Sequence, residues 1–155
     1  MPGYAWDGDS KTREKFFEDD ALLLKAIKKG IRIIPTLNQT KITAKVDSKA
    51  KMSFVKDFLR RFHEMGGEIV LGSDIFNQTL EEEVQNLIDL NILNNQEILK
   101  VLTYNTPLTI FPNRKIGKLA EGYEASFLVF DENVLNNNNA LYSPLFGVKE
   151  GLILE

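Results

Sequence analysis

The first half of the chain repeats one pattern of apolar and polar residues: an amphipathic stretch, a glycine and a short apolar run. Residues 21–29 follow two acidic residues, Asp19 and Asp20, and end in lysines, an order that suits the helix dipole. Gly30 stands where a helix commonly ends in the left-handed conformation. The β-branched run Ile31–Ile34 comes next and predicts a short, buried strand.

A second unit of the same kind follows a polar segment. Residues 37–49 are polar and predict irregular structure. Residues 50–65 carry apolar side chains at helical spacing and end in Gly66 and Gly67, so they predict an amphipathic helix. Residues 68–71 then predict a second short strand. Two helix–glycine–strand units with short joints predict parallel strands, the arrangement of α/β proteins.

The pattern becomes purely helical after residue 74. Thr79 is the expected cap of a helix whose first turn contains Glu81–Glu83, three acids expected to be solvated and favoured by the helix dipole. Asn94 or Asn95 is expected to cap the next helix. Pro107 is expected to end or bend that helix, because proline lacks a backbone N–H group.

The last part of the chain carries a β pattern. Residues 125–130 are the most strand-like run of the sequence, and residues 146–148 and 152–154 predict a closing hairpin. We therefore expect a boundary near residue 112, between an α/β part (1–112) and a small β part (113–155).

Composition excludes several classes of protein. The 155 residues are 43% hydrophobic, enough apolar mass to form a core, so the chain is not expected to be disordered. The longest apolar runs are too short to span a membrane. A net charge of −3 without a basic stripe argues against nucleic-acid binding. No signal peptide is visible, and localisation stays open.

Candidate chemistry is limited by which residues are present. The chain has no cysteine, and His63 is its one histidine, so it cannot build a thiolate or multi-histidine metal site alone. In parallel α/β folds, active sites lie at the carboxyl ends of the strands. That rule selects Pro35–Thr36 and Ser73–Asp74. On local pattern alone, Asp74 is either a turn or cap residue or a metal ligand and proton acceptor.

Several segments, in order, resemble the carboxyl-terminal part of the metal-dependent amidohydrolases, closest to their imidazolonepropionase-like and Xaa-Pro dipeptidase-like branch. A Gly-led run ending in Pro-Thr-Leu resembles the family's penultimate barrel strand, and a Gly-Gly-led run ending in Asp74 resembles its last. The following helices and a Gly-x-Leu-x-x-Gly-x-x-Ala signature also match. The matching segments are residues 29–37, 66–74, 80–92, 94–105 and 117–127.

The resemblance implies the last strands and helices of a (β/α)₈ TIM barrel, followed by part of a composite β-sandwich. It also implies a hydrolase of non-peptide or dipeptide C–N bonds, with a small amide or cyclic amide as substrate and a divalent metal, Zn²⁺ first among them. Asp74 would contact the metal and act as the general base. Asn77 is a candidate substrate contact, with helix capping as the plainer alternative.

The chain also departs from the family. The family's metal-binding histidines would all precede residue 1, and Ser126 stands where the family has aspartate. We therefore expect the chain alone to bind no metal and to be inactive, and its exposed barrel edges to favour oligomers. His63 is expected to be a solvated helix residue, and Trp6 a pocket or loop residue.

Two other interpretations remain open. The chain could belong to a non-catalytic amidohydrolase-like scaffold, or it could be a stand-alone α/β binding domain. The stand-alone domain would need a closed hydrophobic core within these residues.

Overall fold

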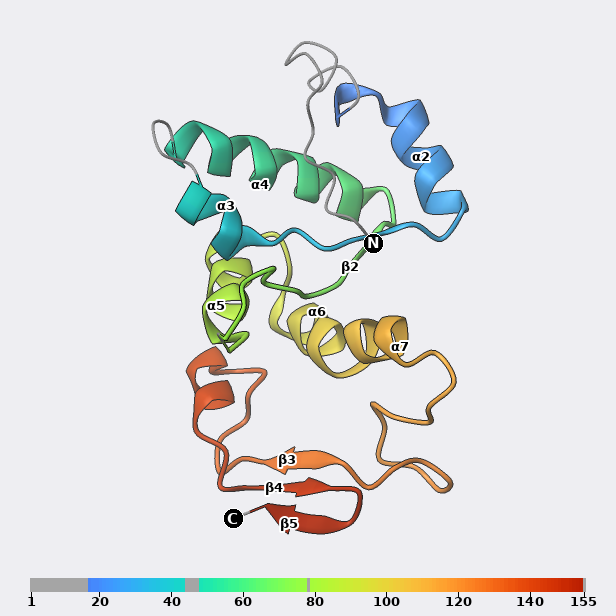
Figure 1. Ribbon diagram of the computed structural model, residues 1–155, viewed down its shortest axis with the longest axis vertical. Helices are drawn as coiled ribbons and strands as arrows, with labels where there is room; N and C mark the ends of the chain where they lie inside the picture. The colour runs from blue at the N-terminus through green and yellow to red at the C-terminus, as the bar shows by residue number, and fades with distance from the viewer. Residues whose placement is uncertain (1–16, 44–47, 78, 155) are drawn as a thin grey trace.

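The computed structural model describes residues 17–43, 48–77 and 79–154. Helices α2 and α4 lie at one end of the molecule, two short strands and further helices lie in the middle, and a three-stranded sheet lies at the other end (Figure 1). Trp6 lies outside the described residues. The elements of the first layers are α2 (Asp20–Lys28), β1 (Arg32–Ile33), α3 (Leu37–Thr43), α4 (Ser48–Glu64) and β2 (Glu68–Ile69).

The first helix–glycine–strand unit forms where the sequence predicts it. The Asp19 carboxylate accepts hydrogen bonds from the N–H groups of Ala21 and Leu22, and so caps α2. Gly30 follows with φ +70°, a conformation that glycine adopts without steric cost. The chain then enters β1 directly.

The two strands are parallel, as predicted. Arg32 pairs with Glu68 and Ile33 with Ile69, and Val70 N–H continues the ladder by donating to Ile33 C=O. The predicted burial of the first strand is wrong, however, because Ile31 and Ile34 are 51% and 54% exposed. Within the described chain β1 pairs with β2 alone, so its other edge has no neighbouring strand to cover these side chains.

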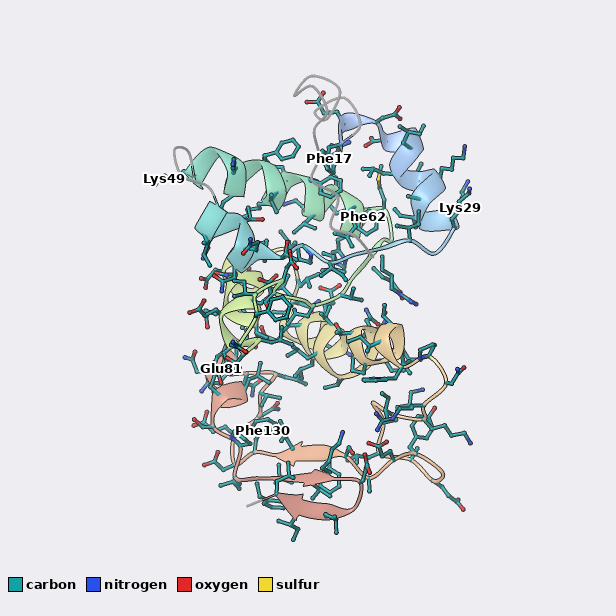
Figure 2. All side chains as sticks on the ribbon, in the orientation of Figure 1. Phe17, Lys29, Lys49, Phe62, Glu81 and Phe130 are labelled. Atoms are coloured by element: carbon teal, nitrogen blue, oxygen red, sulfur yellow. The ribbon has the colours of Figure 1, made fainter. Side chains whose placement is uncertain are left out.

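The core lies between α4, the strands and the later helices. Leu59 and Phe62 of α4 are each 1% exposed and pack in one cluster with Ile69 and Leu71. Figure 2 shows the labelled Phe62 on the side of α4 that faces the strands. This arrangement confirms the amphipathic helix predicted for residues 50–65.

Residues 37–49 are not irregular throughout, as the sequence suggested, because α3 occupies Leu37–Thr43. Leu37 is fully buried and belongs to the core cluster. The first backbone N–H groups of α3 are satisfied by a side chain from α5, a long-range contact that local pattern cannot reveal.

The helical segment after residue 79 departs from prediction at two points. Leu80, not Thr79, is the N-cap of the first helix, and it makes no side-chain capping bond. Asn94 caps the next helix through a capping box with Glu97, as predicted. The helix does not end at Pro107: a π-helical turn precedes it, and Thr106 N–H donates to Val101 C=O. The elements are α5 (Glu81–Leu90), α6 (Asn95–Lys100), η1 (Val101–Asn105) and α7 (Thr106–Ile110).

The remaining strands form a separate antiparallel sheet in the order β3–β4–β5. The hairpin predicted at its end is present, and its two turn residues, Glu150 and Gly151, both have positive φ, 52° and 84°. No described helix is long and apolar enough to cross a membrane. The elements are β3 (Phe127–Val129), η2 (Asn138–Tyr142), β4 (Phe146–Lys149) and β5 (Leu152–Leu154).

Candidate functional site

The carboxyl ends of β1 and β2 lie at the same edge of the two-stranded sheet, because the strands are parallel and in register. Thr36 follows β1, and Asp74 follows β2. The two chain segments remain close together past the ends of the strands, because a Cβ atom added at Gly72 would lie 2.8 Å from Cγ2 of Ile34. The structure therefore brings the two sequence-selected strand ends to one edge.

Asp74 has the properties of a side chain available for chemistry. It is exposed, and its backbone has φ 54°, an uncommon conformation for a residue with a Cβ atom. Among the residues that the structure describes, none forms a hydrogen bond or ion pair with its carboxylate. The neighbouring Ser73 is buried, and its hydroxyl accepts a bond from Ile75 N–H at 3.4 Å. The carboxylate of Asp74 is therefore exposed, with no partner among the described residues.

Asn77 also lies past β2 and is also exposed, with φ 60°. Its positive φ favours a turn, which asparagine tolerates. It does not cap α5, because the N-cap of that helix is Leu80. Phe76, between these residues, is 97% exposed. Gln78 lies outside the described residues.

A threonine that sequence reasoning missed anchors the end of β2. The Thr106 hydroxyl accepts a hydrogen bond from Leu71 N–H at 2.9 Å, in a buried setting. Thr106 begins α7 and is 8% exposed. Its position just after the Thr-x-Asn match was the available signal, but the long-range bond is visible only in the structure.

Thr106→Val is expected to destabilise the fold. The change removes the acceptor but keeps the side-chain shape, so Leu71 N–H is left buried and unpaired, at a cost of about 1–3 kcal/mol in the free energy of unfolding. Urea unfolding followed by circular dichroism measures this loss. Thr103→Val is the matched control, since the exposed Thr103 hydroxyl donates to Leu99 C=O, one helical turn earlier in the chain. Equal losses for the two variants would contradict the anchoring role.

Glu83 stands at the acidic position that the family resemblance marks on this helix, but the sequence reasoning did not predict its role. It was expected to be solvated, yet it is fully buried. Its Oε1 accepts from Leu37 N–H at 2.7 Å and its Oε2 accepts from Asn38 N–H at 2.8 Å. Burial raises the pKa of Glu83 above its ordinary value, and the two backbone hydrogen bonds and Lys41 oppose that rise. The sequence did offer a signal of this burial: Glu83 directly precedes Val84 and so lies at the border of the apolar face of the helix.

Metal-binding side chains do not gather at this edge. The described residues contain no cluster of three or more His, Asp or Glu side chains able to hold a metal ion. His63 is half-buried on α4, with Nε2 3.1 Å from Oε1 of Glu97 on α6, so it is less solvated than predicted. The described residues, Asp74 included, therefore do not by themselves fit a zinc site, which needs three protein ligands.

Comparisons with known proteins add information on the fold. No family model matches the chain, and no curated protein matches it. Solved structures do match. A Xaa-Pro dipeptidase with methionine bound in its active site gives a TM-score of 0.73 at 19% identity, over 90% of this chain and 38% of that one. The A. niger ochratoxinase gives 0.73 at 20% identity, over 90% and 35%. A prolidase complexed with N-methylphosphonate-L-proline gives 0.70 at 19% identity, over 88% and 38%.

These structures are amidohydrolase-family members, and the chain shares the fold of part of them. It spans 35% to 38% of their lengths. The predicted resemblance to the amidohydrolases, on their Xaa-Pro dipeptidase-like side, is therefore confirmed at the level of the fold.

Proposed function

We propose that this chain forms the carboxyl-terminal part of a hydrolase that cleaves C–N bonds in small amides, cyclic amides or dipeptides. The observation that carries the proposal is the fold shared with a dipeptidase, a prolidase and an ochratoxinase over about nine tenths of the chain. In this proposal, residues 1–112 supply the last strands and helices of a TIM barrel, and residues 113–155 supply part of a β-sandwich. The uncovered outer edge of β1 supports it, since further barrel strands would pair there.

Asp74 is the residue to which we assign the chemistry. A carboxylate at the carboxyl edge of the strands can accept a proton from an attacking water molecule and return it to the leaving nitrogen. Its exposure and its unpaired oxygens, among the described residues, leave it free to do so. We assign Asn77 a contact to the substrate because it is exposed three residues farther along the same segment.

We also propose that the longer hydrolase holds a divalent metal, with Zn²⁺ as the first candidate and Asp74 as one ligand. Further ligands would come from outside the described residues, because these contain no cluster of three side chains able to hold a metal ion. The chain by itself is then expected to bind no stoichiometric zinc and to hydrolyse no amide. Metal analysis after dialysis against Zn²⁺ checks this, with Asp74→Asn as the control. One zinc per chain, lost in the variant, would contradict it.

The isolated chain is expected to self-associate through its uncovered strand edges. Ile31 and Ile34 beside β1, and Leu152 and Ile153 of β5, are all more than half exposed. Light scattering coupled to gel filtration measures the mass. We expect species larger than 17.6 kDa at micromolar concentration, and a strict monomer would contradict this expectation.

The proposed function is tested on the full-length polypeptide, which is the whole product of the reading frame that contains these residues. Reading the coding DNA upstream of Met1 shows whether barrel strands and histidine ligands precede it. The purified product is then assayed against N-acyl amino acids, Xaa-Pro dipeptides and cyclic amides. Hydrolysis supports the proposal. An upstream frame without strand-end histidines, with no hydrolysis, would favour the non-catalytic scaffold instead.

The stand-alone binding domain is the less favoured alternative. It requires a closed core within the chain, whereas β1 leaves Ile31 and Ile34 half exposed. The residues of β5 are also exposed, which likewise argues against a closed core.

A further inference from the structure

Glu83 binds the backbone of a distant helix instead of facing solvent as an acidic residue in a first helical turn commonly does. It lies in the first turn of α5 and reaches the beginning of α3, with each carboxylate oxygen accepting one backbone N–H group, from Leu37 and from Asn38. The side chain is fully buried. A buried carboxylate with both oxygens paired fixes the position of the two peptide groups that it binds.

The peptide groups that Glu83 binds come directly after a strained residue. Thr36 has φ 46°, in the left-handed region, where a β-branched residue is a clear outlier. Such a conformation destabilises the folded state and persists only when the surrounding structure holds it. Thr36 C=O also accepts a bond from Thr40 N–H at 3.0 Å, so the chain turns from β1 into α3 at this one residue. Glu83 and the buried Leu37 side chain are the groups that hold the turn.

Thr36 and Asp74 both lie in the segments that follow the carboxyl ends of β1 and β2. Each follows one of two neighbouring parallel strands, at the same edge, and each has a positive φ, 46° and 54°. Strained residues cluster at functional sites, where a defined geometry is worth its cost in stability. Among the described residues, no hydrogen bond to the Thr36 hydroxyl is found, so this hydroxyl has bonding capacity left for a ligand.

The geometry points to Thr36 as a substrate-binding residue at the same sheet edge as Asp74, with Glu83 as the positioning residue that holds it there through Leu37 N–H and Asn38 N–H. This inference rests on the proposed hydrolase function. The group that Thr36 would bind is a hydrogen-bonding oxygen of the substrate next to the scissile amide, either its carbonyl or a neighbouring carboxylate. Loss of the hydroxyl should weaken binding of substrate without removing the base at Asp74.

The positioning link is tested in the chain itself by a double-mutant cycle of Thr36→Gly and Glu83→Gln. Glycine relieves the strain only while Glu83 imposes it. Thr36→Gly should therefore stabilise the fold more in the wild-type background than in the Glu83→Gln background. We expect the factor by which it lowers the unfolding equilibrium constant to differ at least fivefold between the two. Effects that multiply independently within twofold would overturn the link. Where Glu83→Gln does not fold, Glu83→Asp replaces it, since the shorter side chain cannot reach both N–H groups.

The substrate contact is tested by kinetics of the full-length polypeptide with Thr36→Val and Thr36→Ser. We expect valine to lower kcat/KM at least tenfold, mainly through KM, and serine, which keeps the hydroxyl, to stay within threefold of wild type. An active wild-type enzyme whose valine variant is unchanged would overturn the contact and leave the proposed function intact. A wild-type polypeptide inactive on all the amides would overturn both, while the cycle would still decide the role of Glu83.

Discussion

Glu83→Ala is expected to lower the free energy of unfolding of the chain by about 2–6 kcal/mol, because two buried N–H groups lose their acceptor and each costs about 1–3 kcal/mol when unpaired. Among substitutions of single polar residues in α5, this one should lower the free energy of unfolding most. Urea unfolding followed by circular dichroism measures it. Glu81→Gln is the matched control, since Glu81 is exposed on the same helix turn and should change stability by less than about 0.5 kcal/mol.

The same residue predicts a dependence of stability on pH. Burial raises the folded-state pKa of Glu83 above its ordinary value of 4.5, so the folded chain binds this proton more tightly than the unfolded chain does. The contribution is fully present below the unfolded pKa and is lost as pH rises through the folded pKa. We therefore expect the free energy of unfolding of the wild type to fall as pH rises above 4.5. Glu83→Gln, which cannot titrate there, should lack this part of the fall. Identical slopes for the two proteins would contradict this.

If the proposed function holds, Asp74→Asn is expected to lower kcat of the full-length polypeptide by about 10²- to 10⁴-fold, the usual contribution of a general base. The folded chain should lose little stability, because Asp74 is exposed and asparagine tolerates positive φ. Steady-state kinetics and urea unfolding separate the two effects.

Asp131→Asn serves as the control for Asp74, since Asp131 is an exposed aspartate beyond β3 that has no proposed role. Asp74→Gly adds a second test. It should raise stability by about 1 kcal/mol, by relieving the left-handed backbone, while activity stays lost. Full activity in either Asp74 variant would remove this residue from the mechanism.

The elements predicted correctly are those whose signals are local. The acidic cap and the glycine end of α2, the capping box at Asn94 and the positive-φ turn at Glu150 and Gly151 each depend on residues a few positions apart. The parallel pairing also followed from local order, because a helix with short joints leaves little choice of direction.

The elements predicted wrongly depend on contacts between distant residues. Helix α3 forms in a polar segment because Glu83, 46 positions away from Leu37, satisfies its first N–H groups. Burial of Ile31 and Ile34 was inferred from their apolar character, but burial requires neighbouring strands that the described chain does not supply on that side.

The candidate site was predictable in part for the same reason. Asp74 could be selected because a strand followed by an acid is a local pattern, and the structure places it at the expected edge. The roles of Thr106 and Glu83 could not be predicted, since their partners, Leu71 and Leu37, lie more than 30 positions away.

The most direct test is a crystal structure of the full-length polypeptide grown with Zn²⁺, with anomalous data collected at the zinc edge. We predict an anomalous peak at the edge of the sheet where β1 and β2 have their carboxyl ends, with an Asp74 carboxylate oxygen about 2.0–2.2 Å from the ion. A closed fold in which the Asp74 side chain faces solvent, with no ion at that edge, would contradict the account.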